Sequence, residues 1–167
     1  MRVDTEDKVL FWQDDSVFSN WFITDSFLMS GHLFTNSEAA FMWLKAEFFK
    51  DKVVANKILS NQNPAVVKKL GREIENFVSE EWDKVKVALM RKACYAKFKN
   101  SPHKEFLLAT GTKQLVEASP FDKIWGIGFA PCDPNALDEK KWLGQNLLGI
   151  VLMDIRDEFQ NECTQHQ

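Results

Sequence analysis

The stretch TNSEAAFMWLKA, residues 35–46, decides the fold of this chain. It is a run of good helix formers without Gly or Pro, and its large apolar residues recur at helical spacing, which predicts a long helix with one apolar face. Glu38 and Lys45 are seven residues apart, two helical turns, so their side chains project from the same side. A carboxylate and an amine on so apolar a helix are costly to bury unless other groups satisfy them.

A purely structural interpretation of this pair stays open. Thr35-x-x-Glu38 fits a capping box, in which the Glu38 side chain only ties down the first helical turn. Lys45 would then simply extend into solvent. The helix by itself favours the structural interpretation.

Composition narrows the class of protein. Hydrophobic residues make up 45% and aromatic residues 13% of the 167-residue chain, which excludes an intrinsically disordered protein. We expect a single domain over residues 1–167, with a core from about residue 9 to about residue 159 and flexible termini. The net charge of −3 argues against a protein that binds a phosphate backbone by bulk charge, but a local basic pocket stays open.

The cysteines and histidines form no recognisable metal-binding pattern. We therefore expect no metal site, no cofactor and a reducing, cytoplasmic environment. No segment has the pattern of a signal peptide or the ~18 apolar residues of a membrane span, so we expect no association with a membrane. We also expect no obligate protein partner. The cysteine and histidine residues of the chain are Cys94, Cys132, Cys163, His32, His103 and His166.

Turn and cap signals divide the chain into short strands and several helices, an α+β fold that is mainly helical with a small β-hairpin or sheet. The segment 119–144 is rich in Pro and Gly, and so long a loop is uncommon and tends to be functional. Residues 115–118 fit either a strand or a helical turn. The expected elements are a strand at 9–12, a hairpin of 27–29 and 32–34 around Ser30-Gly31, and helices at 52–60, 64–70, 79–99, about 102–108 and about 145–160.

Three places suit a ligand. In the loop Phe18–Phe22, aromatic rings could hold a planar group while Ser19 and Asn20 supply hydrogen bonds, although a loop pinned to the core by its aromatics explains the same pattern. Arg72 follows a predicted helix exit and suits a phosphate or carboxylate, unless it pairs with a nearby glutamate. Asn146 stands at a predicted helix start, where phosphates bind well.

Five blocks together resemble the YbiA/NADAR family. They run in order from about residue 10 to about residue 158, and no single block is specific. The blocks are Phe18-Ser19-Asn20-x-Phe22, Ser37-Glu38-x-x-Phe41-x-x-x-Lys45, Gly71-Arg72, Trp82 to Phe98, and Asp122-x-x-Trp125-Gly126-x-Gly128 continuing to Asn146-x-x-Gly149-x-x-Leu152-Met153-x-x-Arg156.

The resemblance implies an α+β fold and hydrolysis of N-glycosidic bonds between a ribose and a base. One branch of the family removes ADP-ribose from ADP-ribosylated guanine, in nucleic acid or as a nucleotide. Another acts on phosphorylated ribosylamino-pyrimidine intermediates of riboflavin synthesis. The segment 129–141 is longer than the glycine-rich link of the riboflavin branch, which favours ADP-ribosyl-guanine. A non-catalytic ADP-ribose or nucleotide-binding module is the third hypothesis.

The resemblance also assigns roles. Glu38 is the expected acid or base, and Asp122 orients a partner or a water molecule. Lys45 either pairs with Glu38 as an ammonium or attacks the anomeric carbon as a neutral amine, and we favour a direct role slightly. The expected substrate contacts are Ser19, Asn20, Phe22, Trp43, Arg72, Trp125, Gly126, Gly128 and Asn146.

Overall fold

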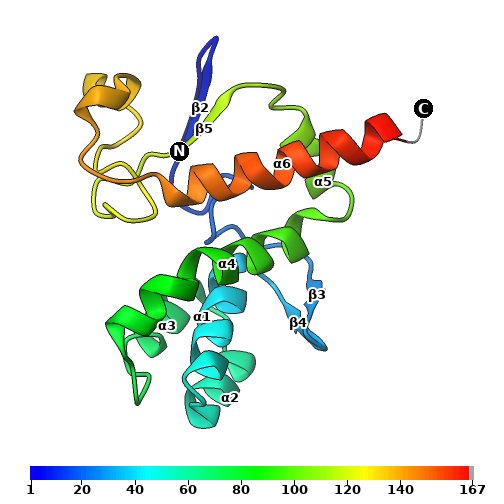
Figure 1. Cartoon of the computed structure of the whole chain (residues 1–167), viewed down its shortest axis with the longest axis vertical. Helices are drawn as coiled ribbons and strands as arrows, with labels where there is room; N and C mark the ends of the chain where they lie inside the picture. The colour runs from blue at the N-terminus through cyan, green and yellow to red at the C-terminus, as the bar shows by residue number, and fades with distance from the viewer. Residues whose placement is uncertain (166–167) are drawn as a thin grey trace. The chain divides into compact units, whose positions relative to one another are not determined.

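The computed structural model describes residues 1–165 and has an α+β fold made mainly of helices (Figure 1). His166, one of the histidines considered above, lies outside the described residues. The chain divides into two compact units. Unit 1 consists of Met1–Phe22 together with the chain from Phe98 onward, and unit 2 is the continuous segment Ile23–Lys97.

Unit 1 contains a three-stranded sheet in the order β1-β2-β5. Strand β2 (Lys8–Phe11) pairs antiparallel with β1 (Arg2–Asp4) and parallel with β5 (Gln114–Glu117). Helix α6 (Leu147–Gln165) packs against β5 and against α5 (His103–Leu108). Residues 115–118, undecided from sequence, therefore belong mostly to a strand, and β1 occupies a segment that was expected to be flexible.

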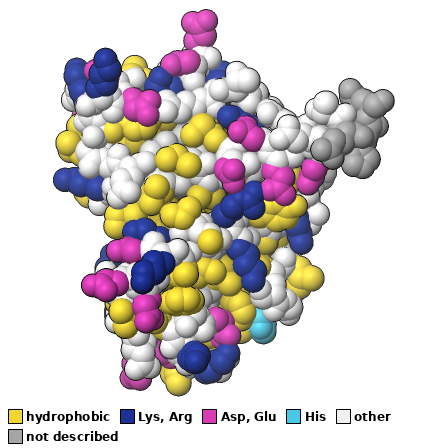
Figure 2. Space-filling model, in the orientation of Figure 1, with side chains coloured by type: hydrophobic (Ala, Val, Ile, Leu, Met, Phe, Trp, Pro, Cys, Tyr) yellow, Lys and Arg dark blue, Asp and Glu magenta, His cyan; other side chains and the backbone are white. Residues whose placement is uncertain are grey.

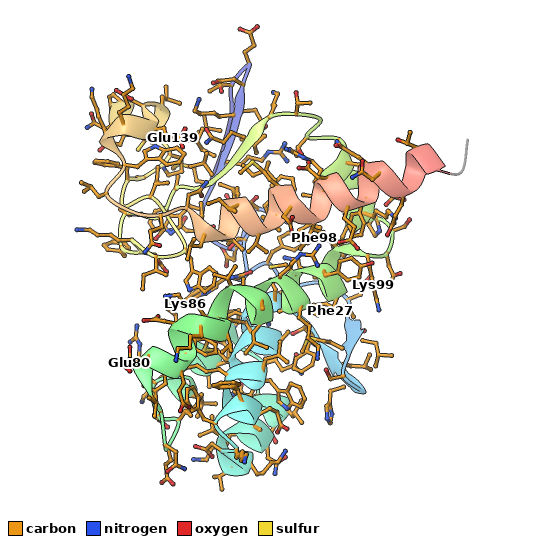
Figure 3. The ribbon with its side chains drawn as sticks, viewed as in Figure 1. Phe27, Glu80, Lys86, Phe98, Lys99 and Glu139 are labelled. Atoms are coloured by element: carbon orange, nitrogen blue, oxygen red, sulfur yellow. The ribbon has the colours of Figure 1, made fainter. Side chains whose placement is uncertain are left out.

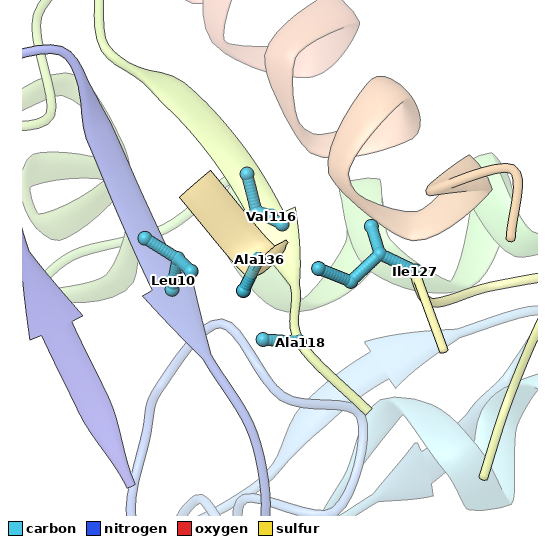
Figure 4. Close-up of a cluster of buried hydrophobic side chains, with 5 residues drawn as sticks. All are labelled: Leu10, Val116, Ala118, Ile127 and Ala136. Atoms are coloured by element: carbon cyan, nitrogen blue, oxygen red, sulfur yellow. The ribbon is translucent and has the colours of Figure 1, made fainter. Parts of the chain in front are cut away.

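The long segment between β5 and α6 is anchored in the core of unit 1. It carries two short 3-10 helices, η1 (Pro134–Leu137) and η2 (Glu139–Lys141). Ala136 of η1 is fully buried, and the Nε1 of Trp142 donates a 2.9 Å hydrogen bond to the Ala136 carbonyl oxygen. Figure 4 shows the buried cluster that results, Leu10, Val116, Ala118, Ile127 and Ala136.

Unit 2 is helical apart from one hairpin. Strands β3 (Phe27–Met29) and β4 (His32–Phe34) are joined by Ser30-Gly31, both with positive φ, as a tight hairpin turn requires. The four helices are α1 (Ser37–Phe48), α2 (Lys52–Ser60), α3 (Pro64–Leu70) and α4 (Ser79–Phe98). Glu80 and Lys86, two of the side chains labelled in Figure 3, belong to α4.

Helix α1 is the centre of unit 2, because it packs against α2, α3 and β4. Its N-cap is Asn36, whose Oδ1 accepts a 2.8 Å hydrogen bond from the backbone N–H of Ala39. The expected capping box at Thr35 is therefore wrong by one residue, because an Asn is at least as good a cap as a Thr. The predicted bounds of α2 and α3 are confirmed, and α6 continues past the expected end near residue 160.

Candidate active site

Glu38 lies in the first turn of α1, in unit 2. Its side chain is buried, with 7% of its surface exposed, and a carboxylate in the first turn is stabilised by the positive end of the helix dipole. Helix α1 can begin here because Asn36 is itself held: its Nδ2 donates to the carbonyl oxygen of Gln62 at 2.8 Å. A buried carboxyl group at a fixed helix start is an arrangement that suits acid or base catalysis.

Two turns further along α1, the Lys45 amine has a defined set of contacts. Its Nζ donates a 2.8 Å hydrogen bond to the carbonyl oxygen of Gly71, at the end of α3. The same nitrogen lies 4.5 Å from the ring centroid of Phe77 and 5.3 Å from that of Trp82. Both rings are within the range of cation–π attraction. Lys45 is therefore held by backbone and aromatic groups and does not simply extend into solvent.

Electrostatics favours the neutral form of this amine. Burial lowers the pKa of Lys45 below its ordinary value, and the positive charge of Arg72 lowers it further. The carboxylate of Glu38 opposes both effects. The structure thus brings Glu38 and Arg72 within electrostatic range of Lys45, and the roles assigned to these three residues stay predictions.

Gly71 is needed because α3 and α1 approach closely at this point. A Cβ on Gly71 would lie 2.1 Å from the Sδ of Met42, although the φ of Gly71 is an ordinary −61°. The absent side chain lets the chain turn past α1 and present the Gly71 carbonyl to Lys45. Arg72 follows directly and is exposed, where it can contact an anion.

The structure does not bring Trp43 together with Lys45. The two residues are about 200° apart around α1, and the Trp43 ring packs against the hairpin, 5.0 Å from the His32 ring and 5.8 Å from the Phe34 ring. Trp82 takes the place near the amine instead. No spacing rule connects Trp82 with Lys45 in the sequence. The one feature of the sequence that could have drawn attention to Trp82 is that a block resembling the YbiA/NADAR family begins there.

The remaining predicted residues belong to unit 1. The Oδ1 of Asp122 accepts 2.8 Å hydrogen bonds from the backbone N–H groups of Ile124 and Trp125. Gly126 is confined by backbone, since a Cβ there would lie 2.9 Å from two carbonyl oxygens, and Gly128 has φ +79°. These residues therefore build a fixed turn in which Trp125 is only partly buried.

Asn146 joins this turn to the sheet. Its Oδ1 accepts a 2.9 Å hydrogen bond from the N–H of Glu117, and its Nδ2 donates one of 2.9 Å to the carbonyl oxygen of Leu115. Both groups of the amide are thus engaged with β5. Only one of the two N–H groups of Nδ2 is used in these bonds, and the side chain is buried, with 2% of its surface exposed. Substrate binding by Asn146 stays a prediction.

Ser19, Asn20 and Phe22 lie in a tight loop of unit 1. The N–H of Ser19 donates to the carbonyl oxygen of Ser16 at 2.9 Å, and the Oγ of Ser19 accepts from the N–H of Trp21 at 3.2 Å. Ser19 and Asn20 are both buried, and Phe22 is partly buried. Their contact with substrate stays a prediction.

Comparison with known proteins identifies the family. The family model described as the NADAR domain matches residues 10–160 of this chain. The chain belongs to the NADAR family. The match includes the Glu38–Lys45 segment of unit 2 and the Asp122–Trp125 turn of unit 1.

Several named proteins are similar to this NADAR chain over most of its length. N-glycosidase R617 of Acanthamoeba polyphaga mimivirus is 40% identical over 149 residues, 86% of this chain and 88% of that protein. N-glycosidase YbiA of Escherichia coli is 31% identical over 150 residues, 89% of this chain and 82% of that protein. Riboflavin biosynthesis protein VVA0006 of Vibrio vulnificus is 30% identical over 161 residues, 95% of this chain but 40% of that protein.

A solved structure agrees with the NADAR assignment. The NMR structure of the E. coli protein YbiA is similar with a TM-score of 0.78 and 28% sequence identity, over 99% of this chain and 92% of that chain. The predicted α+β fold is therefore confirmed. Among the helices that the structure describes, none is both long and apolar enough to cross a membrane, and Figure 2 shows charged side chains spread between the hydrophobic ones.

Proposed function

We propose that this chain is an N-glycosidase that removes ADP-ribose from ADP-ribosylated guanine. Family relatives that match it over most of both chains are named N-glycosidases, which places it among the hydrolases that act on N-glycosyl bonds. The observation that carries the proposal is on α1, where the buried carboxylate of Glu38 and the amine of Lys45 influence each other's charge.

The reaction needs two kinds of help. As the bond between ribose and guanine breaks, positive charge develops on the anomeric carbon and the bonding electron pair leaves with the base. A carboxylate such as Glu38 stabilises the first charge or activates water, and a proton donor neutralises the second. Asp122 is the second carboxylate that we assign to this reaction.

Lys45 has two possible roles. As an ammonium it holds Glu38 in its ionised form. As a neutral amine, Nζ forms a bond to the anomeric carbon while the bond to guanine breaks, and guanine takes a proton as it leaves. Opening of the sugar ring then gives a protonated imine, which water hydrolyses to free Lys45 and ADP-ribose. The lowered pKa of Lys45 supports the second role, because only the neutral amine is nucleophilic.

The choice of ADP-ribosyl-guanine over a smaller substrate has one support, the segment 129–141. Arg72 lies within electrostatic range of Lys45 and is exposed, so it can take a phosphate of either substrate and does not separate them. The segment 129–141, which is longer than the link expected of the riboflavin branch, folds into η1 and η2 and enters the core of unit 1.

The first experiment compares the wild-type protein with Glu38→Gln and Glu47→Gln on ADP-ribosylated guanosine, following released ADP-ribose by mass spectrometry. Glu47 is the matched control, since it is a carboxylate of the same helix that pairs with Lys52 at 2.5 Å. We expect the Glu38 variant to lose at least about 100-fold in kcat and the Glu47 variant to keep wild-type activity. If the wild type binds ADP-ribose but does not turn over the substrate, the hypothesis of a non-catalytic binding module is supported instead.

A second experiment separates the two roles of Lys45. Borohydride added during turnover reduces an imine to a stable amine, so the nucleophilic role predicts a protein carrying the mass of the sugar adduct on Lys45. The Lys45→Arg variant keeps the positive charge but cannot form the imine. If it turns over substrate and the wild type shows no adduct, the ammonium role is correct.

Riboflavin intermediates are the second candidate substrate, because one relative is named a riboflavin biosynthesis protein. That name belongs to a protein of which the chain covers only 40%, so the matched part need not carry the whole activity. Release of the pyrimidine from the phosphoribosylamino-pyrimidine, with no action on ADP-ribosylated guanosine, would select this candidate.

A further inference from the structure

Phe121 is the most exposed large hydrophobic side chain among the residues that the structure describes, with 86% of its surface accessible. Its ring lies 5.9 Å from the ring of Trp12, which is partly buried. A single exposed hydrophobic residue is ordinary on a protein surface. Phe121 differs because of where it stands: it directly precedes Asp122 and is four residues before Trp125, both of which we assign to the candidate active site.

The backbone beneath Phe121 is fixed. Besides the two hydrogen bonds that Asp122 accepts, the carbonyl oxygen of Lys123 accepts a 3.0 Å hydrogen bond from the N–H of Gln145, at the start of α6. The N–H groups of Asn146 and Leu147 are bonded to the same turn. An aromatic ring on so rigid a turn can bind a flat partner without first ordering the loop.

The charge around Phe121 suits an anionic partner. Lys123 is exposed, and no carboxylate within residues 1–165 lies within ion-pairing distance of it. Asp122, the acidic residue between Phe121 and Lys123, accepts two backbone N–H groups through its Oδ1. The turn therefore carries an exposed aromatic ring and, two residues further along the chain, an exposed ammonium.

We propose that Phe121 and Lys123 form a docking point for the single nucleic-acid strand that carries the modified guanine. Phe121 stacks on the base next to that guanine, and Lys123 contacts a phosphate. This inference rests on the proposed function and extends it from nucleosides to nucleic acid. Stacking on an aromatic side chain is the usual way in which proteins bind single strands without reading sequence, and a base taken out of its stack leaves its neighbour's face to be covered.

The test uses two substrates, a single-stranded oligonucleotide with one ADP-ribosylated guanine and ADP-ribosylated guanosine. Phe121→Ser should lower kcat/KM on the oligonucleotide roughly 5- to 150-fold, the effect of losing one stacked base, and leave the guanosine reaction unchanged. Phe121→Trp keeps a stacking face and should restore the oligonucleotide reaction. Leu137→Ser removes another exposed hydrophobic side chain of unit 1 and is the matched control, with no change expected on either substrate.

Lys123 has its own signature. Lys123→Gln should make the salt dependence of the oligonucleotide reaction shallower by about 0.7 in the log–log slope, the value for one phosphate contact on a single strand. The guanosine reaction should show no such change. An unaltered slope on the oligonucleotide would remove Lys123 from the docking point.

Binding measured without turnover keeps the two proposals separate. Fluorescence anisotropy of a labelled, unmodified single-stranded oligonucleotide should show weaker binding by Phe121→Ser than by the wild type and by Leu137→Ser. If the wild type turns over neither substrate but binds in this pattern, the glycosidase function fails and the docking point stands. Equal binding by all variants, or equal loss by Phe121→Ser on both substrates, overturns the docking point. The docking point is also overturned if Phe121→Ser changes the oligomeric state of the protein but not its binding of the oligonucleotide. Phe121 would then lie in a contact between two copies of the chain.

Discussion

The Nζ of Lys45 and the carbonyl oxygen of Gly71 are 2.8 Å apart, so the last turn of α1 is tied to the end of α3 through the amine that we assign to catalysis. The chain leaving α3 therefore controls where that amine lies. The same residue brings Arg72 to its place, because Arg72 is the next residue along the chain. The turn at Gly71 and Arg72 thus fixes the position of the Lys45 amine and also places a positive charge near it.

Lys45 should make stability depend on pH in a defined direction. Its pKa is lowered in the folded protein, so between that value and its ordinary value near 10.5 the unfolded chain binds more protons than the folded one. Stability then rises with pH across this window and gains nothing more above it. We expect the free energy of unfolding of the wild type, relative to Lys45→Met, to increase from pH 7.5 to pH 10 in urea titrations. A difference that stays constant or falls would contradict the lowered pKa.

Two glycine substitutions should differ in cost because they meet different atoms. Gly71→Ala meets the Sδ of Met42, the flexible end of a side chain, and should cost about 1 kcal/mol. Gly149→Ala meets the carbonyl oxygen of Leu115 at 2.1 Å and should cost about 3 kcal/mol or more, because the backbone of β5 has to move. Urea unfolding measures both, and Met42→Ala should remove most of the Gly71→Ala cost. Equal costs for the two alanines would refute the contact argument.

Substitutions of Asp122 can separate its structural role in the turn from its proposed role in the reaction. Asp122→Asn keeps an oxygen that accepts from Ile124 and Trp125, so the free energy of unfolding should stay within about 0.5 kcal/mol of the wild type. Its kcat on ADP-ribosylated guanosine should fall about 100-fold if the charge is used in the reaction. Asp122→Ala should lose activity and also about 1–2 kcal/mol of stability. Full activity of the Asn variant would reduce Asp122 to a turn former.

The cysteines should react very differently with iodoacetamide. Burial raises the pKa of the Cys94 thiol to about 12, and Cys132 is an exposed free thiol. Since the thiolate is the reactive form, native protein at pH 8 should be alkylated at Cys132 within minutes and spared at Cys94. Peptide mass spectrometry reads both sites, and denatured protein should be labelled at each. Rapid native labelling of Cys94 would mean that α4 opens readily.

Much of unit 2 could be predicted from sequence because its signals are local. Asp51 caps α2 by accepting from the N–H of Val54, Pro64 starts α3, and Ser30-Gly31 turns the hairpin, each within a few residues. The placement of Glu38 and Lys45 on one helix was likewise expected from the run of helix formers around them. Local chemistry and the final structure agree at all of these positions.

Contacts between distant segments could not be predicted in this way. The strand at 114–117 is short and becomes a strand only by pairing with β2, far away in sequence. The proximity of Trp82 to Lys45 depends on how α4 packs against the chain that leaves α3. The hydrophobic periodicity of the sequence carries no information on that packing. Asn146 was assigned to phosphate from its helix-start position, whereas its amide is bonded to β5.

The parallel pairing of β2 with β5 also bears on the order of synthesis. Residues 8–11 leave the ribosome early, but their partners at 114–117 follow only after the whole of Ile23–Lys97 has been made. The segment that carries Glu38 and Lys45 is continuous, so it can fold first, while β2 waits with an unpaired edge. A nascent chain stalled before residue 114 would therefore expose β2 to wrong partners and depend on chaperones more than the finished protein does.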